Sequence, residues 1–385
     1  ATQWPRLVLS LGLPFWCGLG LCSAESEADV CLLQLAHAAK PPFHGKPLSA
    51  DPASDEADSA SEDREWPLDG CPPAQSVRCA DAAYKKTAAV YLVGIKERAL
   101  LNTTMEHVLR RCVDDGFSVH LYLSLIFDAS GTGSWLPTRR IAREDPAIAR
   151  LSRRGLQRYV RDSVRPTGAC LVCAEIPERP QALEHIPVNP GQLRDCPPHN
   201  TFTGKRLLNV WLRREQLWNA TLRRERASGK RYDFLMWVRD DAYWVGDMPR
   251  PSALMKGPEA SRTLWSLRDG KWGGLNDRIV MFGRDAAPAL LTLFSGFMRG
   301  GFPNGSSNAE SHLLAAARHG HVVLQYSTFE ELPCAMAMTY DAQQGPALCI
   351  IRMYWYGHAA GVPGLTFCED VEKTTTPRPN RRSKA

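Results

Sequence analysis

Two adjacent aspartates at the end of an apolar segment are the first residues that could do chemistry. Segment 232–245 reads YDFLMWVRDDAYWV, so an apolar run ends at Arg239 and Asp240 and Asp241 follow at once. Side chains that follow a buried parallel strand lie at the sheet edge where α/β proteins bind ligands. Neighbouring carboxylates repel each other unless a cation intervenes, and such oxygen ligands hold Mg²⁺ or Mn²⁺ on a diphosphate. The pattern suggests a divalent-cation site; a solvated turn or an Arg–Asp ion pair is the other interpretation.

Two further segments carry polar residues next to expected elements. Asn276 and Asp277 come just before the apolar run 279–282. Asn308 and Glu310 stand where a helix is expected to begin, and there Asn308 suits the N-cap and Glu310 the first turn. Capping alone would explain both residues, so the pattern leaves open whether Glu310 also takes part in chemistry.

The elements that must position these residues alternate between strand and helix. Apolar runs rich in strand-forming residues are separated by stretches whose apolar residues recur at helical spacing. Strands are expected at 88–95, 117–127, 169–176, 232–238, 262–267, 278–282 and 321–326, helices at 99–115, 147–164, 205–226, 284–298 and 309–319, and a proline-rich loop at 177–198. This alternation predicts a single α/β domain over residues 80–370, with a mixed, mainly parallel sheet flanked by helices.

The helix expected at 205–226 is unusually basic. A nucleic-acid face is one interpretation, but an amphipathic core helix with a solvated basic side is the simpler one. Its arginines include Arg213, Arg214, Arg223, Arg224 and Arg226.

The start of the chain has the pattern of a secretory leader. Arg6 precedes the uncharged run 7–22, and small residues follow at 22–24. We expect residues 1–24 to be a cleaved signal peptide or an uncleaved signal-anchor that attaches the chain to a membrane; a buried segment or an organellar leader is a third interpretation. The first two place the domain in the endoplasmic reticulum or Golgi lumen, or outside the cell.

The net charge of +6 is unevenly distributed along the 385 residues. Residues 25–70 hold eleven acidic and three basic side chains, so the remainder of the chain is strongly basic. Segment 25–79 is expected to be an acidic disordered stem and 371–385 a basic disordered tail, because neither has much to bury. A basic body suits an anionic ligand.

Cysteine usage fits an oxidising compartment. Ten of the twelve cysteines lie beyond the leader, an even number that suggests disulfides. Cys170 and Cys173 form one C-x-x-C, and without a second such pair we interpret them as core or disulfide cysteines, not as zinc ligands. Sequons for N-glycosylation occur at Asn102, Asn219 and Asn304.

Together, the polar segments resemble those of the GT-A-type nucleotide-sugar glycosyltransferases, most closely the glycosyltransferase-like domains of algae, protists and bacteria. The likeness spans residues 86–326: an opening VYLVGIKERALLNTT, a buried strand ending in R-x-D and an aromatic, N-D-R before a strand, and N-x-E at a helix start. The resemblance implies a GT-A-like (Rossmann-like) fold. It also implies transfer of a sugar from a nucleotide-diphosphate donor to a hydroxyl of a glycan or glycoprotein. The expected secretory route disfavours nucleic acid as a partner.

The resemblance also implies which residues line the donor side of the site. Gly94 and Arg98 match first-loop positions near the nucleotide. Arg239 matches the arginine of the R-x-D motif, and Asn276 and Asp277 match the N-D pair.

The remaining matches concern the metal and the acceptor. Asp241 matches the main acid, which implies a metal ligand and catalytic group. Asp240 occupies a position that varies in the pattern and is expected as a second metal ligand. Glu310 matches the acid of the last motif, which implies an acceptor ligand or catalytic base. The sequence departs from the acid-x-acid of many metal-dependent transferases, because Arg239 stands at the first acid, so dependence on Mn²⁺ or Mg²⁺ is open.

Other functions remain open at this stage. A catalytically silent GT-A-like domain that binds glycan or protein is the main alternative, because Arg239 replaces an acid. An unrelated α/β enzyme such as a nucleotidyltransferase is a further one.

Overall fold

The computed structural model describes residues 71–72, 77, 79, 84–127, 146–183, 186, 193–194, 197–198, 201–268, 272–300, 307–342, 345–350 and 367. The expected leader 1–24 and tail 371–385 lie outside these residues, as does nearly all of the expected stem 25–79. Within them, no helix is both long and apolar enough to span a membrane.

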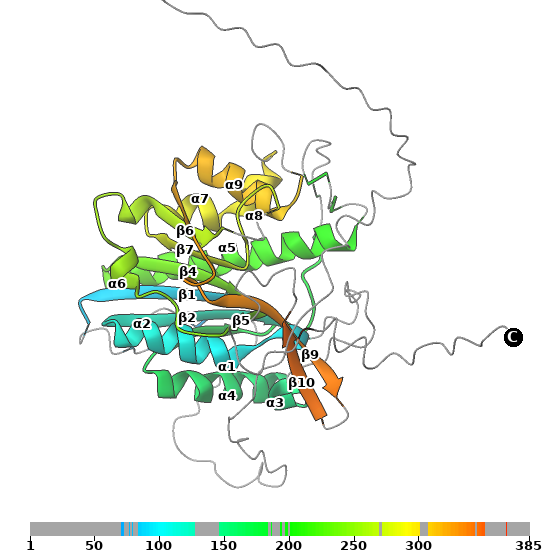
Figure 1. Ribbon diagram of the computed structural model, residues 1–385. Coiled ribbons are helices and arrows are strands. Elements are labelled where there is room, and N and C mark those ends of the chain that lie inside the picture. The colour runs from blue at the N-terminus through cyan, green and yellow to red at the C-terminus, as the bar shows by residue number, and fades with distance from the viewer. Residues whose placement is uncertain are drawn as a thin grey trace, which may run out of the picture.

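A seven-stranded sheet forms the centre of the domain (Figure 1), in the order β3-β2-β1-β4-β7-β6-β8. Strands β3, β2, β1 and β4 are mutually parallel, β7 runs antiparallel to both of its neighbours, and β8 is parallel to β6. The strands are β1 (Lys86–Ile95), β2 (Phe117–Ile126), β3 (Cys170–Glu175), β4 (Phe234–Arg239), β6 (Thr263–Leu267), β7 (Ile279–Gly283) and β8 (Val323–Ser327). This mixed, mostly parallel sheet flanked by helices confirms the predicted fold class.

Helices cover both faces of the sheet, and the side chains of its central strands are therefore buried on both sides. Ala88, Val90 and Leu92 of β1 pack into one core, and Ala89 and Tyr91 into the other. Figure 1 shows α1, α2 and α4 on one side and α5, α7, α8 and α9 on the other. The helices are α1 (Leu101–Thr104), α2 (Arg111–Asp114), α3 (Pro146–Ala149), α4 (Arg153–Val164), α5 (Phe202–Ser228), α6 (Pro251–Leu254), α7 (Ala287–Leu291), α8 (Leu293–Met298) and α9 (Ala309–His319).

Three expected helices are interrupted. The one expected at 99–115 contains the π-helical stretch Met105–Arg110 between α1 and α2. The one at 147–164 divides into α3 and α4, and the one at 284–298 divides at Thr292, whose backbone (φ −111°, ψ 31°) is not helical. Apolar spacing survives such breaks, because the side chains on both sides still face the same core.

A second sheet was not expected from the sequence. Strands β5 (Ala242–Trp244), β9 (Cys334–Ala342) and β10 (Gly345–Ile350) form an antiparallel sheet in the order β10-β9-β5. Strand β5 begins directly after Asp241. Its pairing with β9 therefore fixes the backbone that follows the two aspartates.

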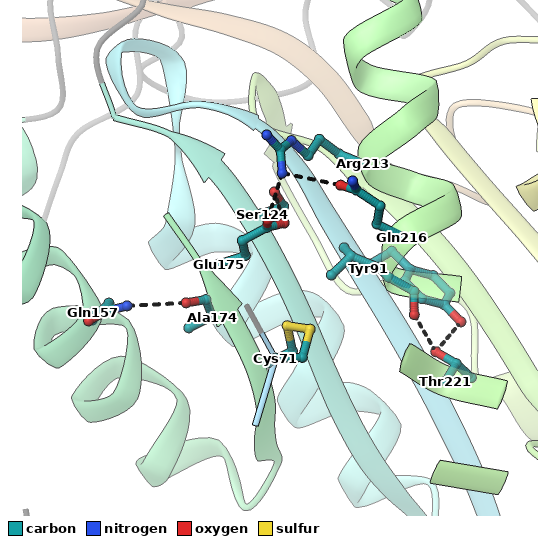
Figure 2. Close-up of a disulfide and its surroundings, with 11 residues drawn as sticks. Cys71, Tyr91, Ser124, Gln157, Ala174, Glu175, Arg213, Gln216 and Thr221 are labelled. Atoms are coloured by element: carbon teal, nitrogen blue, oxygen red, sulfur yellow. Dashed lines mark hydrogen bonds and ion pairs between the residues drawn. A yellow bond between two sulfur atoms is a disulfide. The ribbon is translucent and has the colours of Figure 1, made fainter. Parts of the chain in front are cut away.

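Two disulfides attach the segment before β1 to the edge strand β3. Cys71 bonds to Cys173 and Cys79 to Cys170, so both cysteines of the C-x-x-C are used, as the sequence suggested. Figure 2 shows the Cys71 disulfide beside β3, with Gln157 of α4 donating to the Ala174 carbonyl at 3.3 Å. Cys349 is disulfide-bonded too, and Cys112 and Cys334 are buried free thiols.

The prediction that the basic side of α5 is exposed to solvent is only partly correct. Figure 2 shows Arg213 turned toward β3, where its Nη1 donates to Glu175 Oε1 at 2.6 Å. Long side chains of a helix that crosses a sheet face can reach buried carboxylates at the strand ends. Arg213, Arg214 and Arg224 are buried, and Arg223 and Arg226 are exposed.

Candidate functional site

The sheet topology gathers residues from distant segments at one edge. Strands β1 and β4 are parallel and pair Val93 with Arg239, so the residues that follow both strands lie together. Strand β7 runs the opposite way and pairs Ile279 with Val238, so the residues that precede it reach the same edge. This reversal explains why an Asn-Asp pair before a strand meets two aspartates after one.

Asp240 is held against the end of β1. Its carboxylate accepts the Ile95 backbone N–H at 2.8 Å, and Arg98 donates to both of its oxygens from Nε (3.0 Å) and Nη2 (2.8 Å to Oδ1). A Cβ on Gly94 would lie 2.1 Å from the Asp240 Cγ, so only glycine fits there. The role of Gly94 is therefore to let this carboxylate approach the backbone.

Asp241 forms a fork-to-fork pair with Arg239. Arg239 donates from Nε to Oδ1 at 3.0 Å and from Nη2 to Oδ2 at 2.8 Å, and Arg98 Nη1 lies 3.3 Å from Oδ2. The third nitrogen of Arg239, Nη1, donates to Asp277 Oδ1 at 3.1 Å. Burial raises the pKa of Asp241, but the charges of Arg239 and Arg98 outweigh it and lower the pKa to about 2.

Behind these pairs lies Arg214, which was expected on the solvated side of its helix and is buried instead. Arg214 stacks 4.2 Å over the Trp237 ring, and both side chains donate to the Asp277 carbonyl. Burial lowers the pKa of Arg214 to about 10, although nearby Asp277 opposes the shift. A sequence signal was present, because Arg214 falls three residues after Trp211 and four before Trp218 and so lies on the buried stripe of α5.

Asn276 has a structural position in the loop before β7. Its side-chain oxygen accepts the Arg278 backbone N–H at 3.0 Å, and its carbonyl accepts the Ser266 hydroxyl at 3.1 Å. The side chain is fully buried and orders the turn that presents Asp277.

Glu310 lies in the first turn of α9, close to this loop. The Leu275 N–H donates to the Glu310 carbonyl at 3.0 Å, and a Cβ on Gly274 would lie 1.9 Å from the same carbonyl group. Burial and the charge of Asp277 raise the pKa of the Glu310 carboxyl to about 7. This carboxyl can therefore accept or release a proton near neutral pH.

The start of α9 has the capping geometry that the sequence suggested. Asn308 Oδ1 accepts the Ser311 N–H at 2.8 Å, and Ser311 accepts the Asn308 N–H in return. The Asn308 amide also donates to the Trp272 carbonyl at 3.0 Å, and the Trp272 ring is 37% exposed. Capping thus accounts for Asn308, whereas it does not account for a Glu310 that is buried and protonates near neutrality.

Asp240 and Asp241 do not have the arrangement that a divalent cation needs. Each of their oxygens already accepts a hydrogen bond from an arginine or backbone N–H, and both side chains are 1% exposed. In the described part of the chain, no group of three or more His, Cys, Asp or Glu side chains could hold a metal. A bound cation would have to displace Arg98 and Arg239, so these carboxylates do not fit Mn²⁺ or Mg²⁺, and the alternative of an Arg–Asp ion pair describes them.

The site residues predicted from the sequence thus lie at one edge of the sheet. Six form one network of contacts, whereas Asn276 and Glu310 adjoin it through the loop before β7. Those in the network are Gly94, Arg98, Arg239, Asp240, Asp241 and Asp277.

Comparison with known proteins finds only distant similarity to solved structures. No protein-family model and no curated protein matches the chain. The crystal structure of the glycosyltransferase GlyE of Streptococcus pneumoniae TIGR4 is similar at 12% identity and a TM-score of 0.31, over 64% of this chain and 45% of that one. Its apo form gives 12% and 0.30 over 63% and 45%, and the apo structure of the bifunctional glycosyltransferase WbbM gives 11% and 0.31 over 64% and 39%. The chain spans less than half the length of these structures.

Proposed function

We propose that this protein is a glycosyltransferase that moves a sugar from a nucleotide-diphosphate donor to a hydroxyl of a glycan or glycoprotein. One observation carries the proposal: a buried carboxyl with a pKa of about 7, Glu310, adjoins an arginine-containing cluster at the carboxyl edge of a Rossmann-like sheet. Sequence motifs that resemble those of GT-A-type transferases converge at the same place.

The two parts of this edge suit the two needs of glycosyl transfer. When the bond between the sugar and the diphosphate breaks, negative charge develops on the leaving group, and fixed positive groups stabilise it. The new bond forms between the acceptor oxygen and the same sugar carbon, and the hydroxyl proton passes to a base. We assign that proton to the Glu310 carboxylate.

A screen for donor hydrolysis tests the proposal. The purified protein is incubated with a panel of UDP-, GDP-, CDP-, ADP- and dTDP-sugars, and release of nucleotide is measured with and without a mixture of glycan acceptors. We expect release from one donor class that acceptors accelerate, and that Glu310→Gln abolishes while exposed Glu259→Gln does not. Absence of release from every donor would reject the enzyme.

A silent binding domain is the second candidate, and the ion pairs of Asp240 and Asp241 favour it, since neither carboxylate is open to a ligand. Such a domain would bind a glycan or a protein without releasing nucleotide from any donor. A glycan array probed with the same protein preparation separates the two functions.

We further infer that the domain works in the secretory lumen or outside the cell. Two disulfides support this, because structural disulfides persist mainly in oxidising compartments. Attachment to a membrane through residues 7–22 remains a sequence-based proposal. Expression of the tagged chain should give a lumenal or secreted product with oxidised cysteines; a cytosolic product with reduced cysteines would contradict the inference.

A further inference from the structure

The open side of the cluster consists of Arg98 and Arg239, with the side chain of Asp277 12% exposed beside them. The side chains of Arg98 and Arg239 are 18% and 15% exposed, whereas those of Asp240 and Asp241 are each 1% exposed. A ligand that arrives at this edge therefore meets two guanidinium groups and one carboxylate, and not the buried Asp240 and Asp241. A guanidinium carries five N–H donors, more than the carboxylates described here engage on either arginine.

The charges of the cluster favour an anion over a cation. Three aspartates and a glutamate that protonates near neutrality face four guanidinium groups, so the cluster is close to neutral or slightly positive. A divalent cation placed beside two arginines would be repelled, whereas a diphosphate would be attracted and would accept bidentate hydrogen bonds. The groups are Asp240, Asp241, Asp277, Glu310, Arg98, Arg214, Arg239 and Arg278.

The aspartates fix the arginines in place. Two nitrogens of Arg98 donate hydrogen bonds to the Asp240 carboxylate, which also accepts the Ile95 N–H. Two nitrogens of Arg239 likewise donate to the Asp241 carboxylate, and the third nitrogen of Arg239 donates to Asp277. Side chains restrained in this manner lose little conformational freedom when they bind a ligand.

We propose that Arg98 and Arg239, oriented by Asp240 and Asp241, bind the diphosphate of the nucleotide donor directly and that this binding needs no divalent cation. The aspartates are then positioning residues and not metal ligands. This inference rests on the proposed function, because it names how the same site binds its donor.

Nucleotide binding to the unmodified protein tests whether the diphosphate binds without a divalent cation. Calorimetric titrations with UDP, GDP, ADP, CDP and dTDP are carried out in excess EDTA and again in MnCl₂ or MgCl₂. We expect at least one diphosphate to bind in EDTA with a Kd within about threefold of the value with metal. Binding that appears only with metal would overturn this inference and leave the proposed transferase standing. A failure of all five to bind in either condition would overturn both.

A substitution tests whether the named arginines carry the binding. Arg98→Lys keeps the charge but loses the planar fork, and we expect it to weaken diphosphate binding in EDTA by about tenfold or more. Arg318→Ala, which removes an exposed arginine in the last turn of α9, should leave the Kd unchanged. Equal affinities for Arg98→Lys and the unmodified protein would overturn the assignment. Should Arg98→Lys fail to fold, the EDTA titration of the unmodified protein still decides whether the diphosphate binds without metal.

Discussion

Replacing Glu310 by glutamine should stabilise the protein and inactivate it in the same experiment. The pKa of the Glu310 carboxyl is about 7 in the folded protein, against 4.5 for the ordinary value. At about 1.4 kcal/mol per pKa unit, ionising this buried carboxyl costs the folded state about 3 kcal/mol once the pH exceeds 7. Glutamine has a similar shape and cannot ionise, so the variant avoids that cost.

The sign of the pH dependence follows from the raised pKa. Between pH 4.5 and 7 the folded state binds more protons at Glu310 than the unfolded state, so its contribution to stability falls as the pH rises through this window. The gain from Glu310→Gln should therefore be below about 1 kcal/mol at pH 5 and near 3 kcal/mol at pH 8. The second value corresponds to a rise in Tm of roughly 6–12 °C for a domain of this size.

Urea unfolding followed by tryptophan fluorescence, at pH 5 and at pH 8, measures both free energies of unfolding. Donor turnover by the unmodified protein should rise with pH through about 7, because the base must be ionised, and the variant should lose that dependence with its activity. Glu259→Gln, at an exposed glutamate, is the matched control and should change neither quantity. A Glu310→Gln protein that is less stable at pH 8 would refute the argument from burial, and one that keeps full turnover would refute the role as base.

Three further predictions test the framework around the site. Gly94→Ala places a methyl group within 2.4 Å of the Asp240 carboxylate and should lower the free energy of unfolding by at least about 2 kcal/mol, measured by urea unfolding; an unchanged midpoint would contradict the close approach. The nested disulfides join cysteines 102 and 91 residues apart. Cys173→Ser alone should lower the free energy of unfolding little, because the other bond still closes nearly the same loop. Cys173→Ser combined with Cys170→Ser should lower it by about 4 kcal/mol. Equal and additive losses would count against that loop argument. Trp272→Ala should raise the KM for a glycan acceptor by roughly tenfold with little change in kcat, since an exposed aromatic ring beside α9 can pack on a sugar; an unchanged KM places the acceptor elsewhere.

Hydrophobic periodicity was enough to predict the central sheet. The run at 232–238 is almost continuously apolar, which is typical of a strand covered on both faces. In the structure Phe234 to Val238 of β4 are all buried. The antiparallel direction of β7 is not visible in its own residues, since a strand buried on both faces reads the same in either direction. The second sheet was missed in part because its edge strand β5, which pairs with β9, is only three residues long and shows no periodic pattern.

The candidate site was predicted in its residues but not in its contacts. Adjacent carboxylates after a strand need positive charge, and the sequence alone offers either a metal ion or an arginine. The choice depends on Arg98, which reaches Asp240 across 142 positions, and on the parallel pairing of β1 with β4. Arg214 was misplaced because a charged residue on a buried stripe is rare and needs a partner that only the folded chain supplies.

The ion pairs at the sheet edge form only in the folded chain. Arg98 joins the end of β1 to β4, and Arg239 joins β4 to the loop before β7, so the charges are matched only when all three strands are in place. An anion that binds this edge then binds the native state alone and shifts the folding equilibrium toward it. At a concentration one hundred times its Kd such a ligand adds about 2.7 kcal/mol of stability. On the proposed function, the donor would therefore also stabilise the folded enzyme that uses it.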